Sequence, residues 1–107
     1  MVTTPTPDGY EIEVGPLSRR EALGACKVAV LKDGTPWPGF PKIIADGVTG
    51  TGPAGEYLNF TDLTSDDELT GGDFFTLENL TSGSQYEVIL LWASTVCKFA
   101  SEVINVP

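Results

Sequence analysis

Hydrophobic and polar residues alternate along several short segments of this chain. In residues 10–14, Tyr10, Ile12 and Val14 share one side of an extended backbone, and two glutamates occupy the other side. A strict period of two is typical of a β-strand with one buried face. Alternating or short apolar runs predict further strands at residues 26–31, 42–45, 56–61, 73–80, 85–95 and 98–106. The pattern therefore predicts an all-β protein of about seven strands.

The residues between these segments favour turns. The chain holds 12 glycines and 8 prolines among 107 residues, a content that excludes a helical bundle. Ser18 and Glu21 have the spacing of a helical capping box, and Gly24 follows them. These residues predict one short helical turn near residues 18–23. The sequence shows no internal repeat and no linker.

The first eight residues differ in composition from the rest. They are rich in threonine, and prolines stand at positions 5 and 7. Proline fixes its backbone in a conformation that suits extended chain and disfavours a helix interior. We therefore expect an extended N-terminal arm at residues 1–8 and a single β-sandwich domain at residues 9–107.

A local motif follows the strand predicted at residues 73–80. The strand ends at Leu80, a polar turn contains Gly83, and Tyr86 opens the next strand. A chain that crosses between sheets exposes backbone groups, which a tyrosine covers with its ring and hydroxyl. Leu80, Gly83 and Tyr86 resemble the tyrosine corner of immunoglobulin-like and fibronectin type III sandwiches. The resemblance implies a buried Tyr86 whose hydroxyl bonds to backbone near Leu80 and Gly83.

Two further stretches extend this resemblance. Residues 33–39 (Asp-Gly-Thr-Pro-Trp-Pro-Gly) and 72–80 are similar to the framework of bacterial immunoglobulin-like and carboxypeptidase-regulatory-like modules. From the first matching residue to the last, these stretches span residues 33–86, about half of the chain. They imply an antiparallel β-sandwich of immunoglobulin-like or fibronectin III-like type. They imply no single activity, because such modules serve mostly as spacers, adhesins and virion appendages.

The most apolar of the predicted strands has hydrophobic residues on both sides. Every second residue from Tyr86 to Trp92 lies on one side, which we assign to the core. Ile89 and Leu91 then point to the opposite side, which is usually polar in an antiparallel sheet that faces water. Two explanations remain open. Either a neighbouring segment such as the N-terminal arm covers these residues, or they form a contact patch.

The formal net charge is −9, and it is distributed unevenly. Residues 43–97 contain nine acidic residues and no lysine or arginine, whereas acids and bases balance in the remainder. Nucleic acid is not expected as a partner, because phosphate binding needs clustered lysine or arginine. We interpret the acidic segment as a solvated surface, and the alternative is docking to a basic surface or a cation.

The hydropathy predicts neither a membrane span nor a secretory signal. The longest unbroken apolar run covers residues 88–93, whereas a bilayer span needs ~20 residues. The N-terminus has no basic start followed by an apolar segment, so no signal peptide is expected. We therefore expect synthesis in a host cytoplasm, no membrane partner, and free thiols at Cys26 and Cys97.

The sequence contains few of the residues that catalysis requires. The chain has no histidine, which removes the commonest general base and the commonest metal ligand. No lysine lies at Ser-x-x-Lys spacing, and no glycine-rich loop opens a helix. The acidic loop at residues 62–73 lacks the alternating ligands of an EF-hand, so we interpret it as solvated rather than calcium-binding. We expect no enzyme activity, no cofactor and no metal site.

These observations predict a non-catalytic protein that acts by binding a protein partner or itself. The favoured hypothesis is a virion accessory protein, such as a decoration or cement protein on a bacteriophage capsid or tail. The residues expected to carry the contact are Val2, Thr3, Thr4, Pro5, Thr6, Pro7, Ile89 and Leu91. The alternative is an adhesin or carbohydrate-binding module, in which Trp37, Phe40 and Tyr57 stack on sugar rings.

Overall fold

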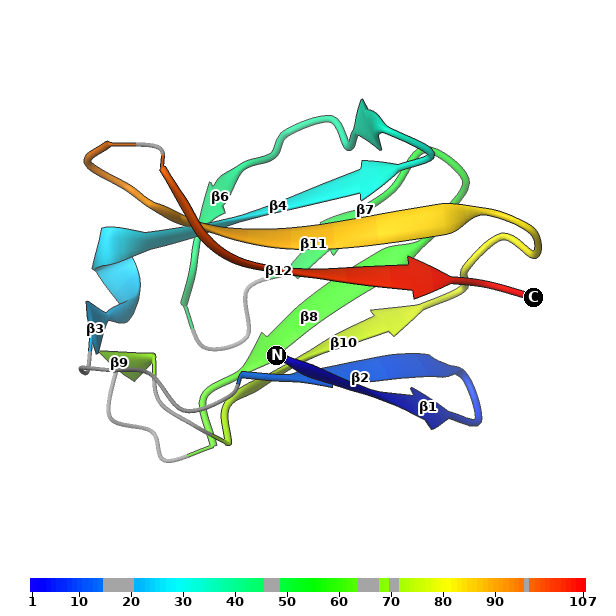
Figure 1. The fold of residues 1–107 in the computed structure, drawn as a ribbon, viewed down its shortest axis with the longest axis horizontal. Coiled ribbons are helices and arrows are strands. Elements are labelled where there is room, and N and C mark those ends of the chain that lie inside the picture. The colour runs from blue at the N-terminus through cyan, green and yellow to red at the C-terminus, as the bar shows by residue number, and fades with distance from the viewer. Residues whose placement is uncertain (15–20, 46–48, 64–67, 70–71, 96) are drawn as a thin grey trace.

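Two antiparallel β-sheets pack face to face in the computed structural model of the chain (Figure 1). The structure describes residues 1–14, 21–45, 49–63, 68–69, 72–95 and 97–107. Nearly all regular structure in these residues is β-strand, with one short 3-10 turn. The predicted all-β antiparallel sandwich is therefore confirmed.

The first sheet contains both N-terminal strands. Its order is β1 (Val2–Thr6), β2 (Gly9–Glu13), β10 (Phe74–Glu78), β8 (Tyr57–Thr61) and β7 (Thr49–Thr51). A row of polar residues crosses the outward face of all five strands and consists of Thr4, Glu11, Thr76, Asn59 and Thr49. The opposite side chains of the central strands are apolar and buried.

The second sheet is built around the longest apolar strand. Its order is β12 (Lys98–Asn105), β11 (Gln85–Trp92), β4 (Cys26–Lys32) and β5 (Thr35–Pro36). β6 (Lys42–Ile43) pairs with β4 as well. The seven strands predicted from the sequence correspond to β2, β4, β6, β8, β10, β11 and β12.

The short helical turn is present, but it lies further along the chain than predicted. The 3-10 turn η1 spans Leu23–Ala25, and Glu21 and Ala22 before it form the extended strand β3 (Glu21–Ala22). β3 pairs with β9 (Glu68–Leu69), so the backbone of Glu21 is used in a strand rather than in a capped helix. Ser18, the other half of the predicted capping box, lies outside the described residues. Leu23 is buried and fixes the position of the turn, which has no side-chain cap.

Most of the expected N-terminal arm forms a strand of the first sheet. β1 is extended, as predicted, and all five of its residues pair with β2 across a tight turn at Pro7 and Asp8. β1 is also the outermost strand on its side of the sheet. Pro5 is compatible with this position, because the free side of an edge strand needs no N–H for a ladder bond.

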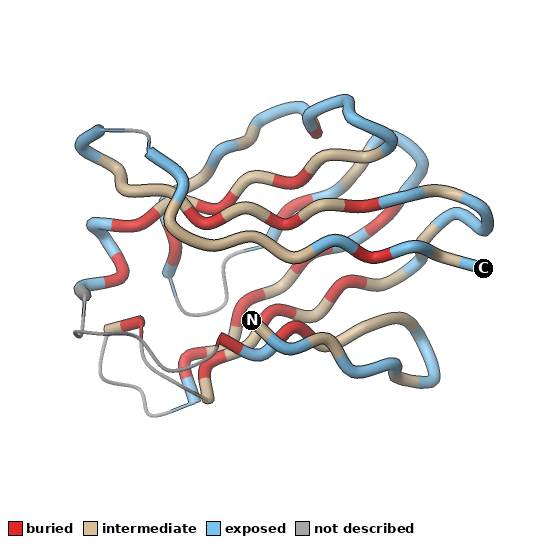
Figure 2. Tube along the Cα trace, viewed as in Figure 1, coloured by how far each residue is buried: buried red, intermediate tan, exposed pale blue. Residues whose placement is uncertain are grey.

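The hydrophobic core lies between the two sheets. Buried and partly exposed residues alternate along β4, β8, β10 and β11, as the red and tan segments of Figure 2 show. In the first sheet, Phe60 and Phe75 pack with their ring centroids 4.8 Å apart. In the second sheet, Tyr86, Val88 and Leu90 are fully buried. The side of β11 that the sequence assigned to the core is therefore confirmed as far as Leu90.

Candidate functional site

The tyrosine corner is present between β10 and β11. Tyr86 is fully buried, and its hydroxyl oxygen accepts a hydrogen bond from the backbone N–H of Thr81 at 2.9 Å. Gly83 lies in the same turn with a φ of 81°, a conformation that glycine adopts without steric cost. The predicted contact between the Tyr86 hydroxyl and backbone near Leu80 and Gly83 is therefore confirmed.

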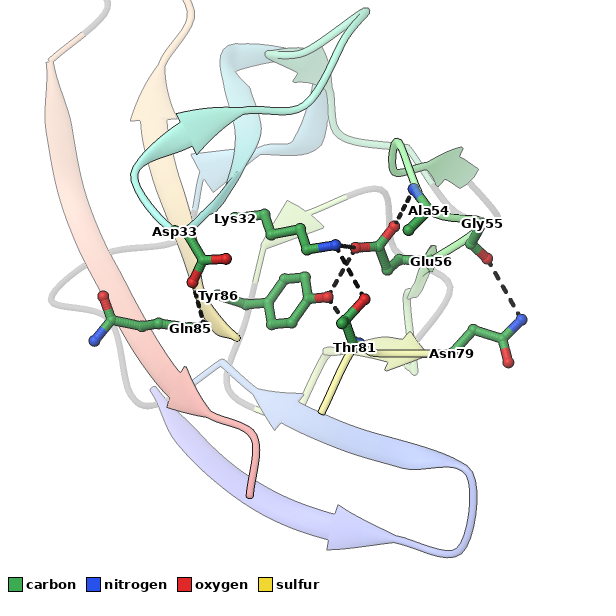
Figure 3. A network of polar contacts seen from close by, with 9 residues as sticks. All are labelled: Lys32, Asp33, Ala54, Gly55, Glu56, Asn79, Thr81, Gln85 and Tyr86. Carbon is green, nitrogen blue, oxygen red and sulfur yellow. Dashed lines mark hydrogen bonds and ion pairs between the residues drawn. The ribbon is translucent and has the colours of Figure 1, made fainter. Parts of the chain in front are cut away.

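A buried carboxylate, which the sequence analysis missed, completes this corner (Figure 3). Glu56 is fully buried just before β8, and its Oε2 accepts a hydrogen bond from the Tyr86 hydroxyl at 2.7 Å. The backbone N–H of Ala54 donates to Glu56 Oε1 at 2.7 Å. The ammonium group of Lys32 lies 3.0 Å from Glu56 Oε2. The carboxylate thus has donors on both of its oxygens.

The surroundings of Glu56 hold it in the charged form. Burial by itself raises the pKa of a carboxyl group, but the hydrogen bonds from Tyr86, Lys32 and nearby backbone outweigh it and lower the pKa of Glu56 to about 2. The same hydrogen bond to Glu56 raises the pKa of Lys32. Both partners are therefore ionised near neutral pH, and the pair is suited to stabilise the fold rather than to transfer a proton.

Further contacts extend this network over the turns of both sheets. Lys32 also donates to the Thr81 hydroxyl at 3.0 Å, and Asp33 Oδ1 accepts a hydrogen bond from the backbone N–H of Gln85 at 2.8 Å. Asn79 donates from its side-chain amide to the carbonyl oxygen of Gly55 at 3.4 Å. The turn after β4, the loop before β8 and the turn after β10 are therefore joined at one end of the sandwich (Figure 3).

Replacing Tyr86 with phenylalanine is expected to lower the free energy of unfolding by about 2 kcal/mol. The ring would stay in the core, but the Thr81 N–H would lose its acceptor and Glu56 would lose a donor. Urea unfolding measures the effect. Tyr57→Phe is the matched control, because Tyr57 is 37% exposed. Equal losses in both variants would contradict the role of the Tyr86 hydroxyl.

Part of the acidic segment is buried, so its interpretation as a solvated surface is wrong for three residues. Glu56, Asp62 and Asp73 are at most 3% exposed, and Asp73 Oδ1 accepts a hydrogen bond from the backbone N–H of Leu63 at 3.1 Å. The sequence held a signal for this arrangement. Glu56 lies two residues before Leu58, and Asp62 lies two residues after Phe60. Both acids therefore continue the every-second-residue pattern of side chains that point into the core.

The rest of the acidic loop is described only in part. Asp66 and Asp67 lie outside the described residues. Within the described part of the chain, no three histidine, cysteine, aspartate or glutamate side chains are grouped so that they could hold a metal ion.

The outward face of the second sheet carries a group of aliphatic side chains, with Lys27 and Glu87 among them. The register places Leu91 beside Lys27, Lys27 beside Ile43, and Ile89 beside Ala29. Leu31 and Val103 flank Glu87. Ile43 is 51% exposed and Val103 is 46% exposed, and the others are half-buried. We call this group the apolar face and define it by Ala29, Leu31, Ile43, Ile89, Leu91 and Val103.

The N-terminal arm does not cover the apolar face. β1 pairs with β2 in the first sheet, whereas Ile89 and Leu91 point outward from the second sheet. The arm, named from the sequence as an example of a covering segment, is therefore not what lies over Ile89 and Leu91. The exposure of Ile43 and Val103 leaves the apolar face accessible, as a contact patch requires.

The residues expected to bind a partner lie on two different sheets. Residues 2–7 belong to β1 and the turn after it, and Val2 is 60% exposed. Ile89 and Leu91 belong to β11. The structure does not gather these residues on one face. Their role in binding a partner stays a prediction.

A shallow hollow lies beside Tyr57 on the first sheet. Its volume is about 350 Å³, and its lining consists of Asp8, Tyr57, Glu78 and Asn79. The other two aromatic residues expected to stack on sugars lie elsewhere: Trp37 is 1% exposed, and Phe40 packs edge-on against it with ring centroids 5.7 Å apart. The three rings therefore form no common stacking surface, and Tyr57 is the ring that borders the hollow.

Neither Cys26 nor Cys97 belongs to a disulfide, as predicted. Trp92 lies between them, because it pairs with Cys26 on one side and its N–H donates to the carbonyl oxygen of Cys97 at 3.0 Å on the other. Two strand spacings amount to about 10 Å. A disulfide needs Cα atoms within roughly 7 Å, so these two residues cannot form one without backbone movement.

The two thiols are expected to differ in reactivity. Cys97 is exposed and Cys26 is buried, so a thiol reagent should modify one group rapidly in the native protein and the second after unfolding. Cys97→Ser should remove the rapid phase, which absorbance of the released reagent measures. Rapid modification of both thiols, or an intact mass two protons lower, would contradict this prediction.

Comparison of the chain with protein-family models, with curated proteins and with solved structures gives no match. The immunoglobulin-like or fibronectin III-like family suggested by the residues therefore stays a prediction. In the part of the chain that the structure describes, no helix is long and apolar enough to cross a membrane.

Proposed function

We propose that this chain is a non-catalytic structural protein that binds a protein partner through the apolar face. The observation that carries the proposal is the set of six aliphatic side chains on the outward side of the second sheet, among which Lys27 and Glu87 also lie. An antiparallel sheet that faces water normally has polar outward residues, and a contiguous apolar patch marks an interaction surface. Burial of such a patch contributes roughly 25 cal/mol per Å².

The two outward faces differ in a way that suits attachment to a large assembly. The outward face of the first sheet carries Glu11, Glu13 and Glu78, and its five described strands contain no lysine or arginine. A protein fixed through its apolar face would keep this acidic face hydrated, which favours solubility of the assembly. We therefore propose an accessory role on a virion, as a decoration or cement protein of a bacteriophage capsid or tail.

Density-gradient sedimentation of particles from the protein's source tests this proposal. The chain is expected to migrate with a large particle, and Leu91→Asp should stay at the top of the gradient because a buried carboxylate would oppose docking. Leu63→Asp is the matched control, because Leu63 is 63% exposed and lies outside the apolar face. Absence of the chain from every particle fraction, or full incorporation of Leu91→Asp, would refute the proposal.

Carbohydrate binding at the hollow is a second candidate function. An exposed aromatic ring with carboxylates and an amide beside it can stack on a sugar and accept or donate hydrogen bonds to its hydroxyls. Tyr57, Asp8, Glu78 and Asn79 supply these groups. A glycan array with the wild-type chain and Tyr57→Ala tests it. Binding that requires Tyr57 and survives Leu91→Asp would favour this function over docking through the apolar face.

A further inference from the structure

We propose that the apolar face binds a second copy of this chain and forms a closed dimer with two-fold symmetry. The inference rests on the proposed function and names the protein partner: the apolar face is buried between two copies, and incorporation into a particle then depends on this dimer. The argument depends on charge complementarity within that face and on the register of β4, β11 and β12.

The outward faces of the two sheets differ in charge. The apolar face has both positive and negative neighbours, so a second copy can approach it without meeting charges of one sign only. Its charged neighbours are Lys27 on β4, Glu87 on β11 and Lys98 at the start of β12. The outward face of the first sheet holds glutamates and no lysine or arginine in its described strands. In a chain of net charge −9, contact between two acidic faces is unfavourable, and contact between two apolar faces of mixed charge is the alternative.

The register defines three rows across the apolar face. The central row holds Ile89 and Ala29, and the rows two residues away on either side contain Leu91 with Lys27 and Glu87 with Leu31. In a dimer whose two-fold axis runs along the central row, the row with Leu91 and Lys27 of one copy lies over the row with Glu87 and Leu31 of the other copy. The central row then meets itself, with Ile89 against Ile89, and the aligned strands match the usual packing of two sheets.

This symmetry also places opposite charges near each other. Glu87 lies over the row that holds Lys27 in the second copy, one strand to the side, and the symmetric pair forms at the same time. Both side chains are available, because neither has a hydrogen bond or an ion pair with another described residue. The dimer would thus combine a buried aliphatic centre with two ion pairs between the copies.

Sedimentation equilibrium of the purified full chain, from micromolar to near-millimolar concentration, tests the proposal. Wild type is expected to pass from monomer to dimer and to go no further. Lys27→Glu and Glu87→Lys should each weaken the dimer by at least about tenfold, and the double variant should recover most of that loss. Ile89→Lys should abolish the dimer. Glu11→Lys, on the other sheet, is the control that should leave it unchanged.

Three results would overturn the dimer: a monomer at every concentration, self-association that Ile89→Lys leaves intact, or no recovery in the double variant. Circular dichroism of each variant shows whether its fold is retained, and Ile89→Ser provides a milder substitution at the same place. A wild-type monomer whose Leu91→Asp variant still leaves the particle fraction would assign the apolar face to a different protein. In that case the proposed function would stand and the dimer would not. Full incorporation of Leu91→Asp into the particle, with a dimer observed in solution, would support the dimer and refute the proposed function.

Discussion

Replacing Glu56 with glutamine is expected to lower the free energy of unfolding by about 3 kcal/mol at neutral pH. The change keeps the size of the side chain but removes the charge that accepts hydrogen bonds from Tyr86, Ala54 and Lys32. The ammonium group of Lys32 would then lie beside a neutral amide, and one of the donors would point at an amide hydrogen. Urea unfolding at neutral pH measures the loss, with Glu13→Gln on the exposed side of β2 as the matched control.

The same substitution should change how stability depends on pH. The pKa of Glu56 is about 2 in the folded protein and 4.5 for an unperturbed glutamate, so the unfolded state binds more protons between these values. The contribution of Glu56 is therefore complete above about pH 4.5 and is lost as the pH falls toward 2, by roughly 3 kcal/mol in total. The free energies of unfolding of wild type and Glu56→Gln, measured at several acidic pH values, should become equal as the pH falls toward 2. Curves that stay parallel down to pH 2 would contradict the buried, charged state of Glu56.

Replacing Gly9 with alanine is expected to lower the free energy of unfolding by about 2–4 kcal/mol, because the new methyl group has no space. Gly9 lies opposite Glu78 in the pairing of β2 with β10, and a Cβ at Gly9 would collide with the backbone carbonyl oxygen of Leu77. A backbone atom in the middle of a sheet cannot move aside as a flexible side chain can. The two strands would have to separate locally, with loss of ladder hydrogen bonds.

Thermal and urea unfolding of Gly9→Ala can be compared with Gly24→Ala. No atom lies within 4 Å of the place that a Cβ at Gly24 would occupy, so this control should be neutral or slightly stabilising. Equal stability of the two variants would show that β2 and β10 are less closely paired near Gly9 than the structure indicates.

The longer strands were predictable because their burial follows a period of two. In β2 and the residue after it, Ile12 and Val14 are buried and Glu13 between them is exposed, and the sequence shows the same alternation in hydropathy. β5 and β7 were not predictable in this way. They span two and three residues, and Thr49–Thr51 has a glycine at its centre, so no period can be recognised. Their place in the sheets depends on pairing with β4 and β8.

The polar network was predictable only in part. The motif around Tyr86 indicated a buried hydroxyl near its own turn, because both partners lie close together in the sequence. Lys32 and Glu56 come from other strands, and their contact depends on how the two sheets pack. The count of acidic residues does not distinguish a buried carboxylate from an exposed one, so the net charge of the segment predicted a solvated Glu56. The apolar face was recognised at Ile89 and Leu91, but its full extent needed the register of β4, β6 and β12.

The proline in β1 affects how these molecules behave when many copies are crowded together. An open strand edge is a template on which further chains add, and repeated addition leads to cross-β fibres. β1 is such an edge, but Pro5 stands near its middle and offers no N–H to an incoming strand. Growth of a fibre from this edge would be interrupted at its first added strand. Copies crowded side by side could therefore touch along this edge and remain separate folded units.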